Sequence, residues 1–243
     1  MQISDDLMLG PVFSGASNTA GSSPMELGVG PMGRVYIFDA VPLVLQVAGL
    51  AASQNPGSGA SFTLAAGTGV TTSTDLNGTV RYILDVPRSV TIKATGANTA
   101  IYKITGYDQY GQLMSQTLAA PSTSTVTSTK MFKSVISVTN TNAAAGTNGI
   151  EVGYSDLIGL PVRAISRDYV VGSNFNATAV ALSAYTVADV TSPATVSTTD
   201  VRGYITLPSA ADGTKRLVVS IAVAGIACGP TATRVGAYGV TQV

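Results

Sequence analysis

The 243-residue chain contains no histidine and no tryptophan, and it has a single cysteine. Without histidine, the sequence excludes a Ser-His-Asp triad, a histidine-ligated metal and an imidazole pH switch. The absence of tryptophan also disfavours a carbohydrate-binding platform. Cys228 cannot form an internal disulfide, and its apolar surroundings in "LVVSIAVAGIACGP" favour a buried, inert thiol. One lone thiol fits assembly inside a cell better than a disulfide-stapled secreted fold.

Charge is also sparse. Charged residues make up 11% of the chain and the formal net charge is zero, whereas about 25% is usual for a soluble domain. A surface without a net field does not steer towards nucleic acid or anionic lipid, so we expect neither as a partner. Little charge repulsion keeps copies apart. We therefore expect part of the surface to be buried against protein partners.

Targeting and membrane-spanning segments are not expected either. The start, "MQISDDLMLG", lacks the basic region of a signal peptide. The longest apolar stretch, residues 35–52, is broken by Asp39, Pro42 and Gln46, whereas a membrane helix needs about 20 mostly apolar residues. We interpret this stretch as buried strand and turn.

Short β-type runs separated by turn signals dominate the rest of the chain. Their spacing of roughly 8–12 residues, without helical periodicity between them, predicts an all-β fold. We expect an antiparallel β-sandwich, jelly-roll-like or barrel fold. Residues 1–34 are predicted as an extended Gly/Pro-rich arm, 35–165 as the main β-domain and 166–243 as a C-terminal β-lobe. That lobe is either packed on the first or an independent domain.

Two hairpins have the clearest sequence signals. Asn77-Gly78 predicts a two-residue hairpin turn. "YKITGYDQYGQLMSQTL" (102–118) places Asp108 first in a type I turn and Gly111 at its left-handed position. This register pairs Tyr102 with Leu118 and Gly106 with Met114 on an apolar face, and it collects lysine, threonine and serine on the other face.

No motif carries recognisable chemistry. "GVGPMG" (28–33) has dinucleotide-site spacing, but it contains Pro31 and precedes a strand, so a Gly/Pro loop is the better interpretation. Glu26 and Glu151 are the only glutamates, and most aspartates lie beside glycine or at strand ends, where they serve turns. "TDLNGT" resembles the start of a calcium loop but lacks its bidentate acid. We predict a protein that is not an enzyme and has no cofactor or metal.

The candidate site is therefore a surface for contact with other proteins. Tyrosine gives a large contact area at low entropic cost, which favours Tyr154 and Tyr110 as interface residues. We expect Tyr110 and its neighbour Gln109 to be exposed at a hairpin tip. Arg163 and Arg167 flank a short turn and could pair with acidic groups of a partner, although a solvated face is the simpler explanation of both.

Four sequence segments, taken in their order along the chain, resemble a known class of proteins. They are "YKITGYDQYGQLMSQTL", "KMFKSVISVTN", "VGYSDLIGLPVR" and "DVRGYITLPSAADGTKRLVVSI". They are similar to virion structural proteins of tailed bacteriophages, in the class of capsid decoration or cement proteins of short-tailed phages. The similarity covers most of residues 30–225. The similarity lies in the residue composition and the order of these segments, and it includes no catalytic signature.

The resemblance implies a non-enzymatic protein that binds the outside of the phage capsid and reinforces the shell. Its partners would be the major capsid protein and further copies of itself, as a dimer or trimer. It would be assembled in the host cytoplasm and located on the capsid surface of the virion. The alternative is a β-sandwich recognition module, such as a head-fibre, tail or receptor-binding component.

Overall fold

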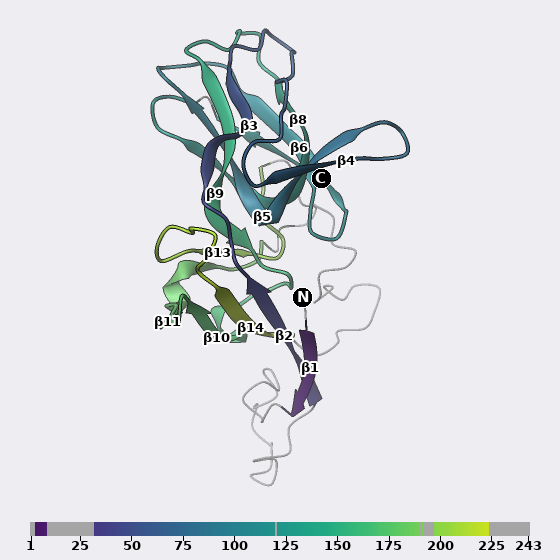
Figure 1. The fold of residues 1–243 in the computed structure, drawn as a ribbon, viewed down its shortest axis with the longest axis vertical. Coiled ribbons are helices and arrows are strands. Elements are labelled where there is room, and N and C mark those ends of the chain that lie inside the picture. The colour runs from purple at the N-terminus through teal and green to yellow at the C-terminus, as the bar shows by residue number, and fades with distance from the viewer. Residues whose placement is uncertain (1–2, 9–31, 120, 190, 192–196, 224–243) are drawn as a thin grey trace.

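Antiparallel β-strands form almost all of the regular structure in the computed structural model (Figure 1), which describes residues 3–8, 32–119, 121–189, 191 and 197–223. The prediction of an all-β fold is confirmed. Helical structure in this part of the chain is limited to two 3-10 turns, Arg167–Tyr169 and Leu182–Ala184. No helix in these ranges is long and apolar enough to cross a membrane.

The strands form two sheets. The smaller sheet has the order β1-β2-β14-β10-β11, and its strands are β1 (Ile3–Met8), β2 (Met32–Ala40), β14 (Leu217–Val223), β10 (Val170–Phe175) and β11 (Thr178–Ala179). It combines the N-terminal and C-terminal parts of the chain, because β2 pairs antiparallel with β14 from Arg34 to Ala40.

The larger sheet has nine strands and curls into a half-barrel. Its main order is β12-β13-β9-β5-β8-β6-β7, with β3 added to β9 and β4 to β5. The strands are β3 (Gln46–Gln54), β4 (Val70–Thr74), β5 (Val80–Ala94), β6 (Tyr102–Tyr107), β7 (Leu113–Leu118), β8 (Val126–Asn140), β9 (Ile150–Gly159), β12 (Tyr185–Thr186) and β13 (Tyr204–Thr206).

The β6–β7 hairpin has the register predicted from the sequence. Tyr102 lies opposite Leu118 and Gly106 opposite Met114. Burial alternates along β6, where Tyr102 and Ile104 are inaccessible to solvent and the residues between them are half-buried. The period-2 pattern that defines a half-buried strand therefore also fixed its pairing.

The β4–β5 hairpin forms as predicted, but its turn differs from the expected two-residue type. The loop between Asp75 and Thr79 contains three residues, and Gly78 adopts the positive φ of 81°. Asp75 Oδ1 accepts hydrogen bonds from the backbone N–H groups of Asn77 and Thr79, both at 2.9 Å. Because this carboxylate caps the turn, a three-residue loop replaces the turn that Asn77-Gly78 alone would favour.

Two runs that the sequence separates, "TVRYILDV" and "PRSVTIKAT", form the single strand β5. Pro87 lies at a register shift in the β5–β8 pairing, between the Ile83 and Arg88 pairs. The missing N–H of proline is tolerated there because the ladder is interrupted. The run "SFTLAAG" (61–67) has the composition of a strand but is an extended segment outside the named strands. The Ala65 and Gly67 N–H groups donate to the carbonyls of Leu50 and Gly49 on β3.

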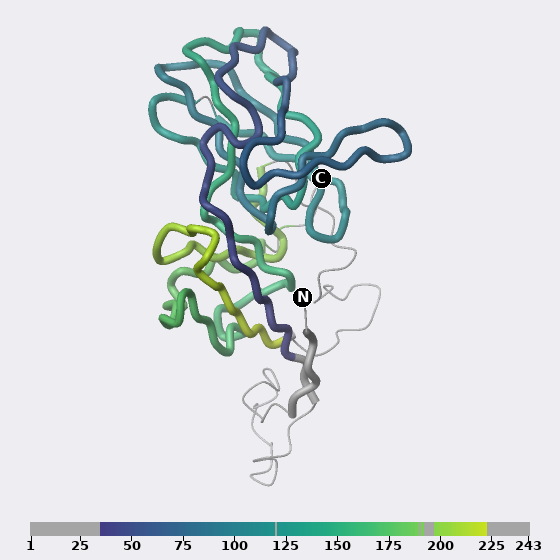
Figure 2. The backbone as a smooth tube through the Cα atoms, in the orientation of Figure 1, coloured from purple at the N-terminus to yellow at the C-terminus, as the bar shows by residue number. Residues whose placement is uncertain are grey.

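The backbone has an upper and a lower half in the view of Figure 2. Among the described residues, buried side chains form two hydrophobic clusters, one in each half. The first lies between residues 50 and 154 and includes Tyr102, Phe132 and Tyr154. The second combines Phe38 of β2 and Val86 of β5 with side chains between residues 158 and 221. Apart from these two residues, the clusters divide near residue 158, whereas the sequence placed the boundary at 166, and β2 belongs with the C-terminal half.

Part of the predicted N-terminal arm is a strand in this structure. Residues 3–8 form β1, which pairs antiparallel with residues 32–37 of β2. The rest of the predicted arm, residues 9–31, lies outside the described residues, as does Cys228.

Candidate interaction surface

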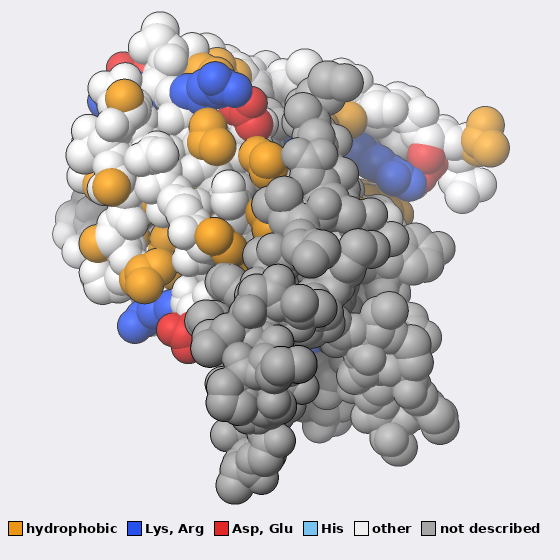
Figure 3. Space-filling view, turned by 90° about the horizontal axis from the view of Figure 1, so that it is seen from below, with side chains coloured by type: hydrophobic (Ala, Val, Ile, Leu, Met, Phe, Trp, Pro, Cys, Tyr) orange, Lys and Arg blue, Asp and Glu red, His pale blue; other side chains and the backbone are white. Residues whose placement is uncertain are grey.

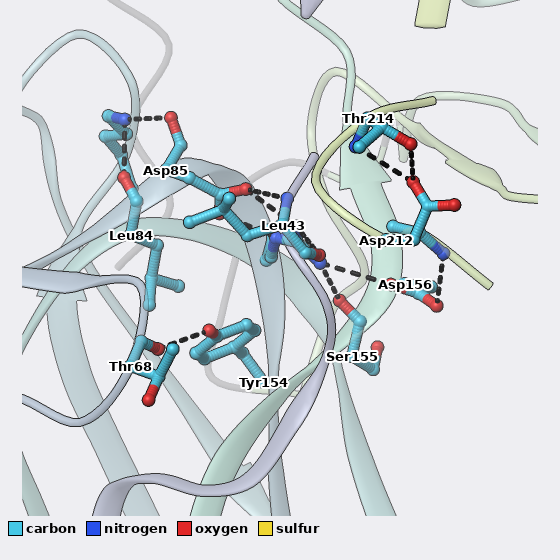
Figure 4. Close-up of polar contacts among 12 residues, drawn as sticks. Leu43, Thr68, Leu84, Asp85, Tyr154, Ser155, Asp156, Asp212 and Thr214 are labelled. Atoms are coloured by element: carbon cyan, nitrogen blue, oxygen red, sulfur yellow. Dashed lines mark hydrogen bonds and ion pairs between the residues drawn. The ribbon is translucent and has the colours of Figure 1, made fainter. Parts of the chain in front are cut away.

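A buried polar network lies where the two halves meet (Figure 4). Its centre is Arg88, whose side chain is inaccessible to solvent. Its Nε and Nη2 donate to the two carboxylate oxygens of Asp85, each at 2.7 Å, and Nη2 also donates to the Leu43 carbonyl at 2.6 Å. Nη1 donates to the Ser155 carbonyl at 3.1 Å and to Asp156 Oδ1 at 3.2 Å. Every guanidinium nitrogen is therefore committed to a structural bond.

Neighbouring groups extend this network into both halves. The Leu43 N–H donates to Asp85 Oδ2 at 2.7 Å, and the Ala211 N–H donates to Asp156 Oδ2 at 3.3 Å. Lys133 Nζ donates to the carbonyls of Leu84 at 2.6 Å and Asp85 at 2.8 Å. Burial lowers the pKa of Lys133, and the nearby Asp85 carboxylate opposes that shift. The arrangement holds the loop after β2, strands β5, β8 and β9, and the loop before β14 together.

The tip of the β6–β7 hairpin is docked against the C-terminal half of the molecule. Asp108 Oδ2 accepts a hydrogen bond of 2.5 Å from Arg202 Nη2, and both side chains are almost fully buried. The Tyr110 hydroxyl donates to the Pro161 carbonyl at 2.8 Å. The Arg202 guanidinium carbon lies 5.2 Å from the centre of the Tyr110 ring. The tip therefore fastens the two halves to each other.

This docking corrects the expectation that Gln109 and Tyr110 are exposed. Both side chains are only partly accessible. Burial raises the pKa of the Tyr110 phenol, while the Arg202 charge acts in the opposite direction. Burial also raises the pKa of Tyr36 on β2, and the neighbouring Tyr110 raises it further. Tyr110 is thus enclosed by both halves of the molecule.

The other predicted interface residues do not converge on one surface. The prediction of Tyr154 as an interface residue is wrong, because this residue is 1% exposed and its hydroxyl donates to the Thr68 carbonyl at 2.8 Å. Arg163 is half-buried and donates to the Asp189 carbonyl at 3.3 Å. Arg167 is exposed, and its Nε donates to the Tyr185 carbonyl at 2.8 Å.

Two open hollows adjoin the hairpin tip and share Gln109 and Lys133. The first, of about 600 Å³, lies between the end of β2 and the middle of β5. The second, of about 520 Å³, lies between the tips of the β4–β5 and β6–β7 hairpins. Its lining residues are Ser73, Thr74, Asp75, Leu76, Arg81, Ile83, Tyr107, Asp108, Gln109, Gly111, Lys133 and Ser134.

Charged and aromatic side chains lie close together in the second hollow. The Arg81 guanidinium carbon lies 4.1 Å from the centre of the Tyr107 ring, and its Nη2 is 3.5 Å from Asp75 Oδ2. Leu76 at the tip of the hairpin is fully exposed. No group of three or more potential metal ligands occurs within the described ranges. An arginine stacked on tyrosine beside exposed leucine resembles the anchors of protein interfaces.

The sequence reasoning missed Arg88 and the Asp108–Arg202 pair. Asp85 and Arg88 gave a signal, because two charges within the apolar run "YILDVPRSV" require buried partners. Arg202 gave none, since its partner lies 94 residues away in the chain. In comparisons with known proteins, no family model, no curated protein and no solved structure matches the chain.

Proposed function

We propose that the chain is a non-enzymatic virion structural protein that binds the outer surface of a phage capsid and stabilises the shell. In this proposal its partners are the major capsid protein and further copies of the chain, as a dimer or trimer. The location is the capsid surface of a virion assembled in the host cytoplasm. The bacteriophage assignment depends on the resemblance of the sequence segments described above.

The observation that supports a binding role most directly is how the charged groups beside the hollows are used. Asp85 and Lys133 line the first hollow, and together with Arg88, which bonds to Asp85, they hold backbone and side-chain groups of the protein itself. A general acid or base needs a polar group that can reach a substrate. Groups arranged in this way favour a rigid scaffold with contact surfaces over a reaction centre.

The shape and composition also agree with this role. The Arg88 network and the docked hairpin tip join the two halves, so that load on one half is transmitted to the other. The face drawn in Figure 3 has few charged side chains, in line with the 11% of charged residues in the chain. Such a surface suits many small apolar and hydrogen-bonded contacts with a lattice. The alternative of a recognition module that binds through an exposed Tyr110 is less well supported, because the hydroxyl of that side chain donates to the Pro161 carbonyl.

Cryo-electron microscopy of intact particles tests the proposal. The expected result is density for this fold on the outside of the head, at regular positions of the capsid lattice. Density confined to the tail or to a fibre would overturn it in favour of the recognition module. Particles stripped of the protein should also release their DNA at a lower temperature than complete particles.

A further inference from the structure

Among the described residues, strand β4 is paired along one edge only. It pairs with β5 in a regular register from Val70 opposite Leu84 to Thr74 opposite Val80. On its other side, no hydrogen bond reaches residues 71–74 within the described part of the chain. These four side chains are exposed, and the hairpin projects from the body of the molecule (Figure 1).

The other edges of the larger sheet have protection that β4 lacks. The outer edge of β3 bonds to residues 65 and 67. Strand β7 is fastened to β8 by Gln116, and β12 has only two residues. Strand β4, "VTTST", contains no charge, no proline and no bulge. Natural sheets rarely leave such an edge bare, because it is a template for another strand.

The hairpin geometry identifies the groups on this edge. The Asp75 N–H donates to the Thr79 carbonyl, and hydrogen-bonded pairs alternate along an antiparallel ladder. Thr71 and Ser73 therefore direct their backbone groups at β5. Thr72 and Thr74 direct theirs outwards.

We infer that β4 pairs antiparallel with β4 of a second copy of the chain, about a two-fold axis at Thr72. This pairing is self-complementary, as an isologous contact requires. Thr72 faces Thr72 of the second copy, and Thr71 faces its Ser73. No like charges meet along the strand. The inference names the contact that would form the homo-oligomer of the proposed function and rests on it to that extent, but it does not require a capsid.

The ends of the paired strands fit one another as well. Continuing the register places Leu76 of one copy beside residues 67–69 of the second. A Cβ at Gly69 would lie 2.9 Å from Leu43 Cδ1, so the loop after β2 lies next to this position. Val44 and Leu45 in that loop are 46% and 38% exposed, and Leu76 is fully exposed. The contact would bury these apolar side chains on both copies.

The test uses the position of Thr72 on the axis. Light scattering after size-exclusion chromatography should show a dimer for the unmodified chain in the micromolar range. Thr72→Lys and Thr72→Glu place like charges opposite each other, so each should raise the dissociation constant at least about tenfold. An equimolar mixture of the two variants should restore a dimer, which native mass spectrometry identifies as the heterodimer.

Thr117→Lys, at an exposed position on β7, is the matched control and should leave the dimer intact. Circular dichroism checks that all variants fold. A monomeric unmodified chain, a trimer, or a dimer insensitive to Thr72→Lys would overturn the β4 contact. None of these results tests the proposed binding to capsids. That proposal is overturned only if the protein is absent from the head of the particle.

Discussion

At the scale of single residues, Asp108 uses its two carboxylate oxygens for different purposes. Oδ1 accepts hydrogen bonds from the N–H groups of Tyr110 and Gln112, each at 2.8 Å, which closes the hairpin turn. Oδ2 accepts from Arg202. Turn formation was evident from the sequence, whereas the buried ion pair was not, since a turn aspartate is usually solvated.

Removing Arg202 should be far more damaging than removing an exposed arginine. Arg202→Met leaves the Asp108 carboxylate buried without its ion-pair partner, which should lower the free energy of unfolding by about 3–5 kcal/mol. Arg216→Met breaks the exposed ion pair with Asp39 and should leave the free energy of unfolding almost unchanged, because solvent screens such a pair. Urea unfolding of both variants measures the difference. Equal losses would contradict the structural role of the buried pair.

The buried amine of Lys130 should make stability depend on pH. Burial lowers its pKa to about 8, while Asp200 and Asp189 oppose the shift. Between pH 8 and about 10.4, the ordinary pKa of lysine, the unfolded chain binds the proton and the folded protein does not, so stability should rise with pH. Once the unfolded lysine has also lost its proton, stability should fall towards pH 12, because burial raises the pKa of Tyr185 to about 12 and unfolded tyrosine ionises first.

Thermal unfolding at a series of pH values checks this dependence. Lys130→Met should weaken the rise in stability above pH 8. Below pH 8 the variant should gain stability relative to the unmodified protein, because no charged amine is buried. Lys103→Met, on the half-exposed face of β6, is the control and should keep the rise. A pH profile unchanged by Lys130→Met would show that another group is responsible.

At the scale of the elements, Gln116 on β7 replaces a missing stretch of β-ladder. Its Oε1 accepts from the N–H groups of Thr129 and Lys130, both at 2.9 Å, and its Nε2 donates to Thr129 Oγ1 at 2.7 Å. The side chain thus joins the edge strand β7 to the first half of β8 and helps the sheet to curl.

Gln116→Leu keeps the volume but leaves two backbone N–H groups without an acceptor. The loss should be about 1–3 kcal/mol per unsatisfied group. Hydrogen exchange should accelerate at the amides of Thr129 and Lys130 more than elsewhere. Thr117→Val, at the exposed neighbouring position, should change neither. Uniform acceleration over the whole sheet would instead indicate a general loss of stability.

Whether the sequence predicted an element correctly depends on how far apart in the chain the interacting residues lie. The β6–β7 register was predictable because alternation and the turn lie within 17 residues of sequence. The continuous β5 was not, because Pro87 reads as a strand break unless the partner strand shifts register there. The docking of Tyr110 depends on Pro161, 51 residues away, and nothing near Tyr110 indicates it.

At the scale of the whole molecule, the two halves should unfold together. The smaller sheet joins β2 to β14, so the C-terminal half is not a continuous piece of chain. Contacts of Asp108 with Arg202 and of Asp156 with Ala211 cross between the clusters. A domain comprising residues 35–165 would retain β2 and Phe38 but lose the strands that cover them.

Calorimetry of the full chain should therefore show one transition, with equal calorimetric and van't Hoff enthalpies. The fragment 35–165 should lack a cooperative transition, because the second cluster is then exposed to water on one side. A variant in which residues 35–165 are followed by a linker and then by β14 should regain part of the cooperative transition, since β2 recovers its partner strand. Two separate transitions in the full chain, or a fragment that melts cooperatively as a monomer, would show instead that the first cluster is an autonomous domain.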